Sequence, residues 1–173
     1  MGHTRDRGLC LRRRTASRWK APTRGYARLM PAIVLSGSRV IHAPAEAIFD
    51  LLADPSAHPR IDGSGTVRSL ATNPARLSLG ARFGMNMHIV FPYRITSTVV
   101  EFEEGRRIAW RHLGGHVWRY ELEPHVEGTK VTETFDGTTS RAPILLKVMG
   151  VERKHPRAIK ATLERLDQLA TPA

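Results

Sequence analysis

Residues 106–135 read RRIAWRHLGGHVWRYELEPHVEGTKVTETF, and they show the clearest strand pattern of the chain. Apolar and polar side chains alternate within three short runs, which is the period of a strand with one buried face. Gly114-Gly115 and Glu127-Gly128 separate the runs, and dipeptides that contain glycine are typical of hairpin turns. The stretch therefore predicts three antiparallel strands, at 107–113, 117–124 and 130–137.

The same pattern continues toward the N-terminus. Turn-forming residues at Asn73-Pro74, Pro92 and Glu104-Gly105 separate further apolar runs at hairpin spacing. The strands expected there are 66–71, 81–90 and 94–103. Six successive strands without an intervening helix predict an antiparallel meander rather than parallel βαβ units.

A strand and two helices are expected before the meander. The strand covers 33–42 and ends at Ala43-Pro44. A helix is predicted at 45–53, because Pro44 suits a helix start and its apolar residues form one stripe. Turn formers follow, and a short second helix is expected within 56–64.

The C-terminal segment predicts a long amphipathic helix at 156–170. Ile159, Leu163 and Leu166 recur at helical spacing, and Leu169 and Ala170 are expected to continue the stripe. Pro156 is expected in the first turn, where a missing N–H is tolerated. Residues 144–149 are expected to form a preceding helical turn packed under the sheet.

These elements predict an α+β domain at residues 33–171. A curved antiparallel sheet of about seven strands wraps the C-terminal helix, which is the only large element left to cover its apolar face. A bent sheet gripping one helix rarely fills at its centre. We therefore expect an internal cavity of the kind that binds small molecules.

The net charge of +11 is concentrated near the N-terminus. Residues 1–30 hold nine Arg or Lys against one acid, Asp6, and show no apolar period, so residues 1–32 are predicted to be a basic disordered tail. Three explanations stay open: an extension from a start placed upstream of Met30, a segment that binds nucleic acid or anionic lipid by charge, and an organelle transit peptide.

Several classes of protein are not expected. The chain has no apolar run long enough to span a bilayer, so we expect no transmembrane segment. Cys10 is the only cysteine, which rules out an intramolecular disulfide and fits a cytoplasmic location. Dinucleotide, phosphate-loop and nucleophile-elbow motifs are missing, and no histidine pair has metal-ligand spacing. We therefore expect neither a cofactor nor a metal.

Five segments resemble the START-like superfamily, also called SRPBCC, which includes polyketide cyclases/dehydrases and birch-pollen-allergen-like proteins. The segments are 38–55 (SRVIHAPAEAIFDLLADP), 58–65 (HPRIDGSG), 118–124 (WRYELEP), 128–135 (GTKVTETF) and 161–166 (ATLERL). The resemblance covers about residues 36–170 and implies a helix-grip fold. Members include lipid carriers, receptors and cyclases, so the resemblance leaves the activity open.

Strand alternation predicts which side chains line the cavity. Most are apolar or aromatic, and each is also explained as ordinary core. The predicted ligand-binding residues are Phe83, Met85, Met87, Ile108, Trp110, His112, Trp118, Tyr120, Leu122, Glu133, Phe135 and Leu163.

The polar members of this set are the candidate catalytic residues. His112 and Glu133 are expected to form an acid/base pair acting on a ketone or enol, with Tyr120 as a hydrogen-bond donor. The alternatives are a purely structural polar trio, or a register shifted by one residue that turns Glu133 toward solvent.

Three functions follow, in order of preference. The first is binding of a small hydrophobic or aromatic molecule that resembles a polyketide, lipid or isoprenoid. The second is a cyclase/dehydratase-type enzyme that uses His112, Tyr120 and Glu133. The third is interaction of the basic tail with nucleic acid or membrane, and nucleic acid is not the partner we favour. A monomer and a homodimer are both compatible with the sequence.

Overall fold

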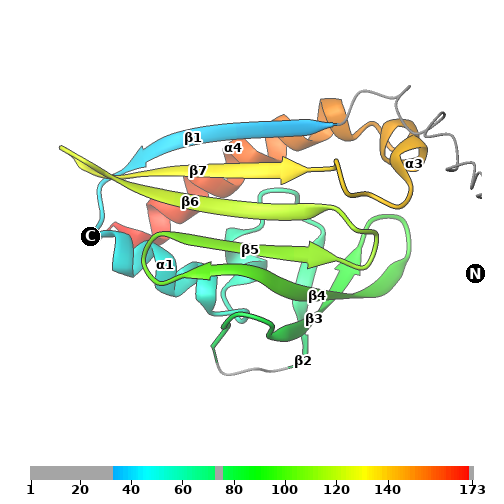
Figure 1. Ribbon diagram of the computed structural model, residues 1–173, viewed down its shortest axis with the longest axis horizontal. Helices are drawn as coiled ribbons and strands as arrows, with labels where there is room; N and C mark the ends of the chain where they lie inside the picture. The colour runs from blue at the N-terminus through cyan, green and yellow to red at the C-terminus, as the bar shows by residue number, and fades with distance from the viewer. Residues whose placement is uncertain (1–32, 73–75, 172–173) are drawn as a thin grey trace, which may run out of the picture. The chain divides into compact units, whose positions relative to one another are not determined.

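The computed structural model describes residues 33–72 and 76–171 (Figure 1). The predicted tail at 1–32 and the predicted turn at Asn73-Pro74 lie outside the described residues. The predicted order of elements is otherwise confirmed: a strand, two short helices, six strands and a long C-terminal helix, with one further short helix before the last.

A single seven-stranded sheet forms one layer, in the order β1-β7-β6-β5-β4-β3-β2. Every neighbouring pair is antiparallel, as the meander predicts. The last strand returns beside the first, so β1 extends the sheet at the edge formed by β7. The strands are β1 (Val34–Ile41), β2 (Val67–Thr72), β3 (Arg82–His88), β4 (Pro92–Glu103), β5 (Arg107–His112), β6 (Val117–His125) and β7 (Gly128–Asp136).

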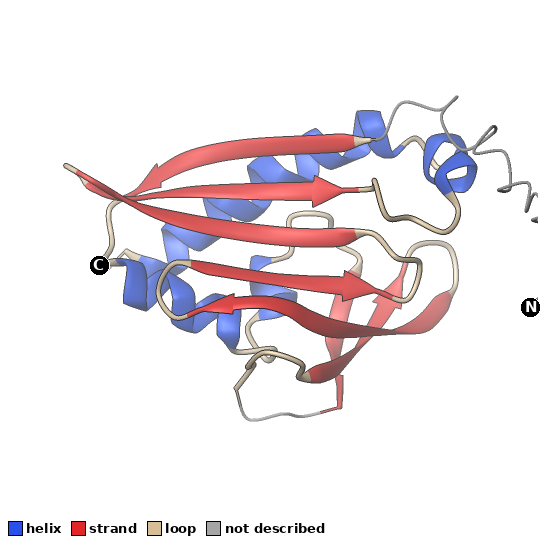
Figure 2. Ribbon diagram, in the orientation of Figure 1, coloured by secondary structure: helices blue, strands red, loops and turns tan. Residues whose placement is uncertain are grey.

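The sheet is strongly curved. Its register shifts between Val99 and Glu101 of β4, and twice more where β2 pairs with β3. An unmatched residue in one strand bends that strand and increases its twist. Figure 2 shows the resulting bend of the sheet: β2 and β3 run across the direction of β1 and β7. The curvature creates a concave face that one helix can cover.

The helix that covers this face is α4 (Val151–Ala170), which runs along β1 and β7 (Figure 1). Its buried residues include Ile159, Leu163 and Leu166, as the sequence predicts. Leu169 is exposed, so the prediction that it continues the buried stripe is wrong. Ala170, which is half-buried, packs against the same core, so the predicted stripe continues at that position.

The start predicted for this helix is also wrong. It begins at Val151, which places Pro156 inside the helix rather than in its first turn. Gly150 has φ 69°, and its carbonyl accepts hydrogen bonds from the N–H groups of Arg153 and Lys154, each at 3.1 Å. These bonds begin the helix one and a half turns before the proline.

Three short helices complete the structure: α1 (Ala45–Ala53), α2 (His58–Ile61) and α3 (Pro143–Val148). The bounds predicted for α1 are confirmed, and it buries Ile48, Phe49 and Leu52. In α3 only Leu146 is buried, against Phe135 and Val151, so the prediction that this turn packs under the sheet holds for one side chain. None of the helices in the described ranges has the length and hydropathy needed to cross a membrane.

A close backbone contact holds α2 against α4. A Cβ atom on Gly63 would collide with the carbonyl oxygen of Ala158 and the N–H of Thr162. The Gly63 N–H donates to the Thr162 hydroxyl at 2.9 Å, and that hydroxyl donates to the Ala158 carbonyl at 3.0 Å. Asp62 caps the following turn by accepting bonds from the N–H groups of Ser64, Thr66 and Val67.

Candidate functional site

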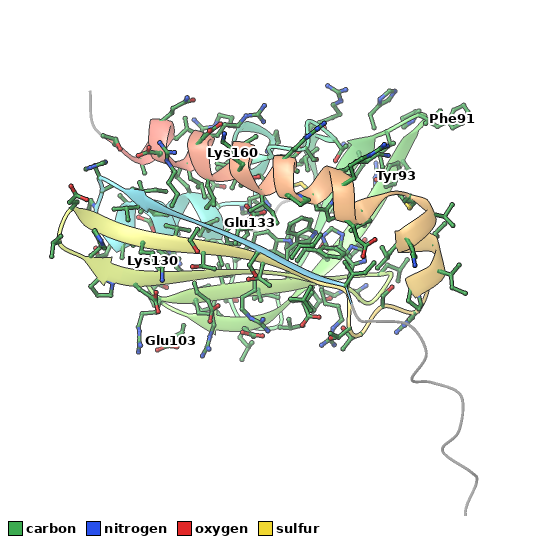
Figure 3. The ribbon with its side chains drawn as sticks, turned by 90° about the horizontal axis from the view of Figure 1, so that it is seen from above. Phe91, Tyr93, Glu103, Lys130, Glu133 and Lys160 are labelled. Atoms are coloured by element: carbon green, nitrogen blue, oxygen red, sulfur yellow. The ribbon has the colours of Figure 1, made fainter. Side chains whose placement is uncertain are left out.

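The most unusual residue of the interior is Glu133 on β7. Its side chain points between the sheet and α4 (Figure 3) and is 3% exposed. The register pairs it with Tyr120 on β6, whose hydroxyl donates to Glu133 Oε1 at 3.0 Å. Glu133 Oε2 is buried and has no hydrogen-bond partner among the described residues. The site therefore holds a carboxyl group with one oxygen bound and one free.

Burial changes the protonation of this pair. It raises the pKa of Glu133 from 4.5 to about 8, because the charged form loses its hydration, and the Tyr120 hydrogen bond opposes this only in part. Burial and the neighbouring carboxyl also raise the pKa of Tyr120 well above its ordinary value. At neutral pH Glu133 is therefore a neutral acid, and Oε2 can donate a hydrogen bond as well as accept one.

An aromatic wall continues from this pair. Tyr120 lies against Trp110 with ring centroids 5.3 Å apart, and Trp110 stacks on His58 at 4.9 Å. Phe83 packs edge-on against both Trp110 and His58, at 5.8 Å and 5.3 Å. The predicted residues Trp110, Tyr120 and Phe83 thus lie together beside Glu133.

His58 was missed by the sequence analysis as a site residue. It comes from α2, and its Nε2 lies 3.0 Å from the carbonyl oxygen of Leu52. Burial lowers its pKa, so the ring is neutral at physiological pH and can stack as an aromatic group. Its contact with Trp110 joins segments that are far apart in the chain. Strand alternation could not predict this contact, because His58 lies on a helix.

The other predicted apolar residues belong to the same core. They are buried in one cluster with the helices, and their packing is equally compatible with a ligand wall and with ordinary core. They are Met85 and Met87 on β3, Ile108 on β5, Leu122 on β6 and Leu163 on α4.

His112 lies elsewhere, at the end of β5. The β5–β6 hairpin places it opposite His116, with ring centroids 4.7 Å apart, rather than beside Glu133. The His112–Glu133 pair expected from the sequence is not formed, because Tyr120 holds one oxygen of Glu133 and no described residue holds the other. The short loop around Gly114-Gly115 could have predicted that His112 faces His116, since the length of a hairpin loop fixes which residues lie opposite each other.

His112 instead joins a second aromatic cluster. His116 packs on Phe135 at 5.2 Å, and His155 of α4 packs on Phe135 at 4.6 Å and on Trp118 at 5.1 Å. Burial is the largest cause that lowers the pKa of His112 to about 3 and that of His155 to about 4. The predicted residues His112, Trp118 and Phe135 are therefore brought together here, as a neutral histidine-aromatic cluster.

No group of three or more His, Cys, Asp or Glu within residues 33–72 and 76–171 is placed to hold a metal ion. A polar hollow of about 110 Å³ is lined by Glu103, Arg106, Arg107, Glu121, Leu122 and Glu123. Ion pairs such as Arg107–Glu103 and Arg106–Glu103 cross it. This surface hollow does not correspond to the predicted apolar cavity.

Comparison with known families decides the classification. The sequence profile of the family described as "Polyketide cyclase / dehydrase and lipid transport" matches residues 32–171, which is nearly all of the chain beyond its basic N-terminal stretch. The chain belongs to this family. The START-like resemblance seen in the sequence is confirmed, and so is the helix-grip fold that it implies.

Curated proteins with similar sequences were compared next with this family member. A Mycobacterium tuberculosis protein named "Uncharacterized protein Rv0088" is 39% identical over 145 residues, which is 79% of this chain and 64% of that protein. The chain thus spans somewhat less than two thirds of the length of the curated relatives it matches.

Solved structures support the fold alone. Protein CV1439 from Chromobacterium violaceum has a TM-score of 0.65 and 19% identity, covering 82% of this chain and 99% of that one. The di-domain ARO/CYC BexL from the BE-7585A biosynthetic pathway has a TM-score of 0.62 and 18% identity, covering 82% of this chain and 51% of that one. At such identities the neighbours' own roles do not transfer to this chain.

Proposed function

We propose that the chain binds a small, flat, mostly apolar molecule between the sheet and α4, and that one oxygen of this molecule is recognised by Glu133. The observation that carries the proposal is Glu133 Oε2, which is buried without a partner among the described residues. A buried polar atom left unbonded is costly, so it favours a ligand that completes its hydrogen bond.

The surroundings of Glu133 define the chemistry of such a ligand. Because burial keeps Glu133 neutral at pH 7, its hydrogen bond suits an uncharged carbonyl or hydroxyl better than a cation. The rings of Trp110 and Tyr120, which lie against each other beside Glu133, form an aromatic wall that suits aromatic or polyene carbon. Polyketide-like, lipid-like and isoprenoid molecules share this combination of apolar carbon with one or a few oxygens.

Room for the molecule depends on flexible side chains. The ring contacts between Trp110, His58 and Phe83 show that this part of the interior is closely packed. Met85 and Met87 lie on the same inner face, and methionine changes rotamer at low cost. Binding is therefore expected to repack the methionines while the aromatic wall and Glu133 keep their places.

The test uses acetylnaphthalene and ethylnaphthalene, which differ by one carbonyl oxygen, titrated into the full chain while tryptophan emission is recorded. Acetylnaphthalene is expected to bind about tenfold more tightly or better, in line with one buried hydrogen bond. Glu133→Met should abolish this preference, whereas Glu133→Gln should keep it because the amide still donates. Glu121→Met, on the outer face of β6, is the matched control and should change nothing.

Saturable binding of neither probe, together with no small molecule retained in native mass spectrometry of the gently purified chain, would contradict the proposal. Equal binding of both probes would contradict the role given to Glu133.

A ligand-binding protein of this kind with one cysteine is expected to act in the cytoplasm.

A second candidate function is enzymatic, and the raised pKa of Glu133 favours it. A neutral carboxylic acid in an apolar site can hydrogen-bond to a ketone oxygen and so acidify the adjacent α-carbon of a β-hydroxyketone. Once the α-proton passes to a solvent water molecule, the enolate expels the β-hydroxyl, which leaves as water with that proton. His112 is not in reach as the base of this acid, so Tyr120 and Glu133 remain the candidate catalytic residues.

An assay for dehydration separates the two functions. A phenyl-substituted β-hydroxyketone would be incubated with the chain, and the conjugated enone product followed by absorbance. An enzyme should lose turnover in Glu133→Gln while it keeps its affinity for acetylnaphthalene, and its rate should fall as the pH rises through about 8. A carrier should form no enone with either chain.

A further inference from the structure

Large apolar side chains are exposed at one end of the molecule. The tip of the β3–β4 hairpin presents Phe91, which is 76% exposed, and the β5–β6 turn presents Leu113, which is 75% exposed. α3 presents Val148, which is 78% exposed. Further exposed apolar residues adjoin them: Ile89, Val90 and Tyr93 on the hairpin, and Ile144, Leu145 and Met149 on and just after α3.

These segments share the same end of the long axis. Figure 1 places α3, the β3–β4 hairpin and the β5–β6 turn together at one end, opposite the turns that join β4 to β5 and β6 to β7. Figure 3 shows the labelled Phe91 and Tyr93 at the tip of that end, with α3 at the same end. We define the α3 end as residues 88–94, 111–116 and 138–154.

The charge of the α3 end is strongly positive. Its only acidic residue is Glu152. No described residue forms an ion pair with its basic side chains, so their charges are available to an outside partner. The Arg and Lys residues of this end are Arg94, Arg111, Arg141, Lys147, Arg153 and Lys154, and all six are exposed.

The opposite end has a different character. Its β4–β5 turn carries Glu103, Glu104, Arg106 and Arg107, so acids and bases are mixed. The β6–β7 turn there exposes one apolar side chain, Val126, which is 97% exposed and stands beside Glu127. The cluster of apolar and basic side chains is therefore specific to the α3 end, and Val126 offers a matched control.

We infer that the α3 end docks on the surface of a lipid bilayer that contains anionic lipids. Apolar and aromatic tips inserted at the headgroup level, with Lys and Arg beside them to contact phosphates, are the features that bind proteins to such a surface. A second copy of the chain fits less well, because its own α3 end would bring the same positive charges together. This inference goes beyond ligand binding and does not depend on it.

The test measures co-sedimentation of the full chain with phosphatidylcholine vesicles, with and without about one third phosphatidylglycerol. Binding is expected only to the anionic vesicles, and raising the salt should weaken it. The double variants V90D/F91D and I144D/V148D should each reduce the partition coefficient about tenfold or more, because each places two charges where apolar groups would insert. V126D should bind as the unchanged chain does.

The basic N-terminal stretch is present in every variant, so it cannot produce a difference between them. Equal binding of all variants would show that charge at the N-terminus alone attracts the chain, and would overturn the inference. Absence of binding by the unchanged chain would also overturn it. A dimer in light scattering that the two double variants convert to monomers would assign the α3 end to a self-interface instead.

A second measurement does not depend on loss of binding. In the variant F91W, tryptophan emission should shift to shorter wavelength on addition of anionic vesicles, and brominated acyl chains should quench it more than they quench V126W. Equal quenching of the two variants would place position 91 no deeper than the opposite end, and would contradict insertion of the hairpin.

Discussion

At the scale of single residues, the most unusual feature is a carboxyl group, that of Glu133, buried in an apolar interior. Glu133 is held by one hydrogen bond from Tyr120, so burial is only partly compensated and its neutral form is favoured. The histidines show the same effect with opposite sign, because burial lowers the pKa of His112 and His155 and keeps them uncharged. At neutral pH all three side chains are therefore expected to be uncharged.

The buried acid makes stability depend on pH. The folded pKa of Glu133 is about 8 and its ordinary value is 4.5, so the folded state keeps a proton that the unfolded chain releases between these values. The contribution of Glu133 is fully present below about pH 4.5 and is lost as the pH rises toward 8, at about 1.4 kcal/mol per pH unit.

Glu133→Gln should remove that dependence. The difference in unfolding free energy between variant and unchanged chain, from urea denaturation at several pH values from 5 to 8, should shift in favour of the variant as the pH rises. Taking the difference cancels the contributions of the histidines. Two parallel stability curves would show that Glu133 is not buried as described.

At the scale of elements, the helices are placed by backbone details that side-chain patterns do not reveal. Pro156 lies inside α4, where it removes one hydrogen bond to the carbonyl of the residue four positions earlier. Gly63 allows the chain after α2 to touch the backbone of α4 directly. Pro156 weakens α4, and Gly63 fixes the distance between α4 and the chain after α2.

Pro156→Ala should stabilise the protein. The substitution restores an N–H within the second turn of α4 and removes a ring from an exposed position, so the free energy of unfolding should rise by about 1–3 kcal/mol. Thermal and urea unfolding would measure it, with Arg157→Ala at the next exposed position as control. An unchanged midpoint would mean that the helix starts only after the proline.

Gly63→Ala should destabilise the protein. The added methyl would meet the backbone of Ala158 and Thr162, which cannot move without shifting α4, so a loss of about 2–3 kcal/mol is expected. Gly114→Ala is the control, because its new Cβ would meet only the movable ring of His116. Similar small losses in both variants would show that α2 and α4 are not held this closely.

At the scale of the whole molecule, two apolar clusters join the sheet to the helices. Their described members run from Ile33 to Ala170 along the chain. The long axis is polarised, since most of the exposed large apolar side chains lie at the α3 end and mixed charges lie at the other.

Residues 30–173 are expected to fold without the basic stretch. A chain that begins with Met30 should unfold cooperatively with a midpoint within about 2 °C of the full chain, because it keeps every residue of the described core. Calorimetry of both chains would measure it. A clearly lower midpoint would show that the first residues contribute to the core, and would contradict the predicted division at residue 32.

The strands, the hairpins and the faces that the strands bury follow from the order of residues along the chain. Strand period and turn chemistry are local properties, so Phe83, Tyr120 and Glu133 could be assigned to one face from residue order alone. Tertiary structure decided what meets across elements: His58 on Trp110, His155 on Phe135, and Glu133 without His112. Such contacts depend on sheet curvature and helix placement, which arise from packing over the whole domain and leave no periodic trace in the chain.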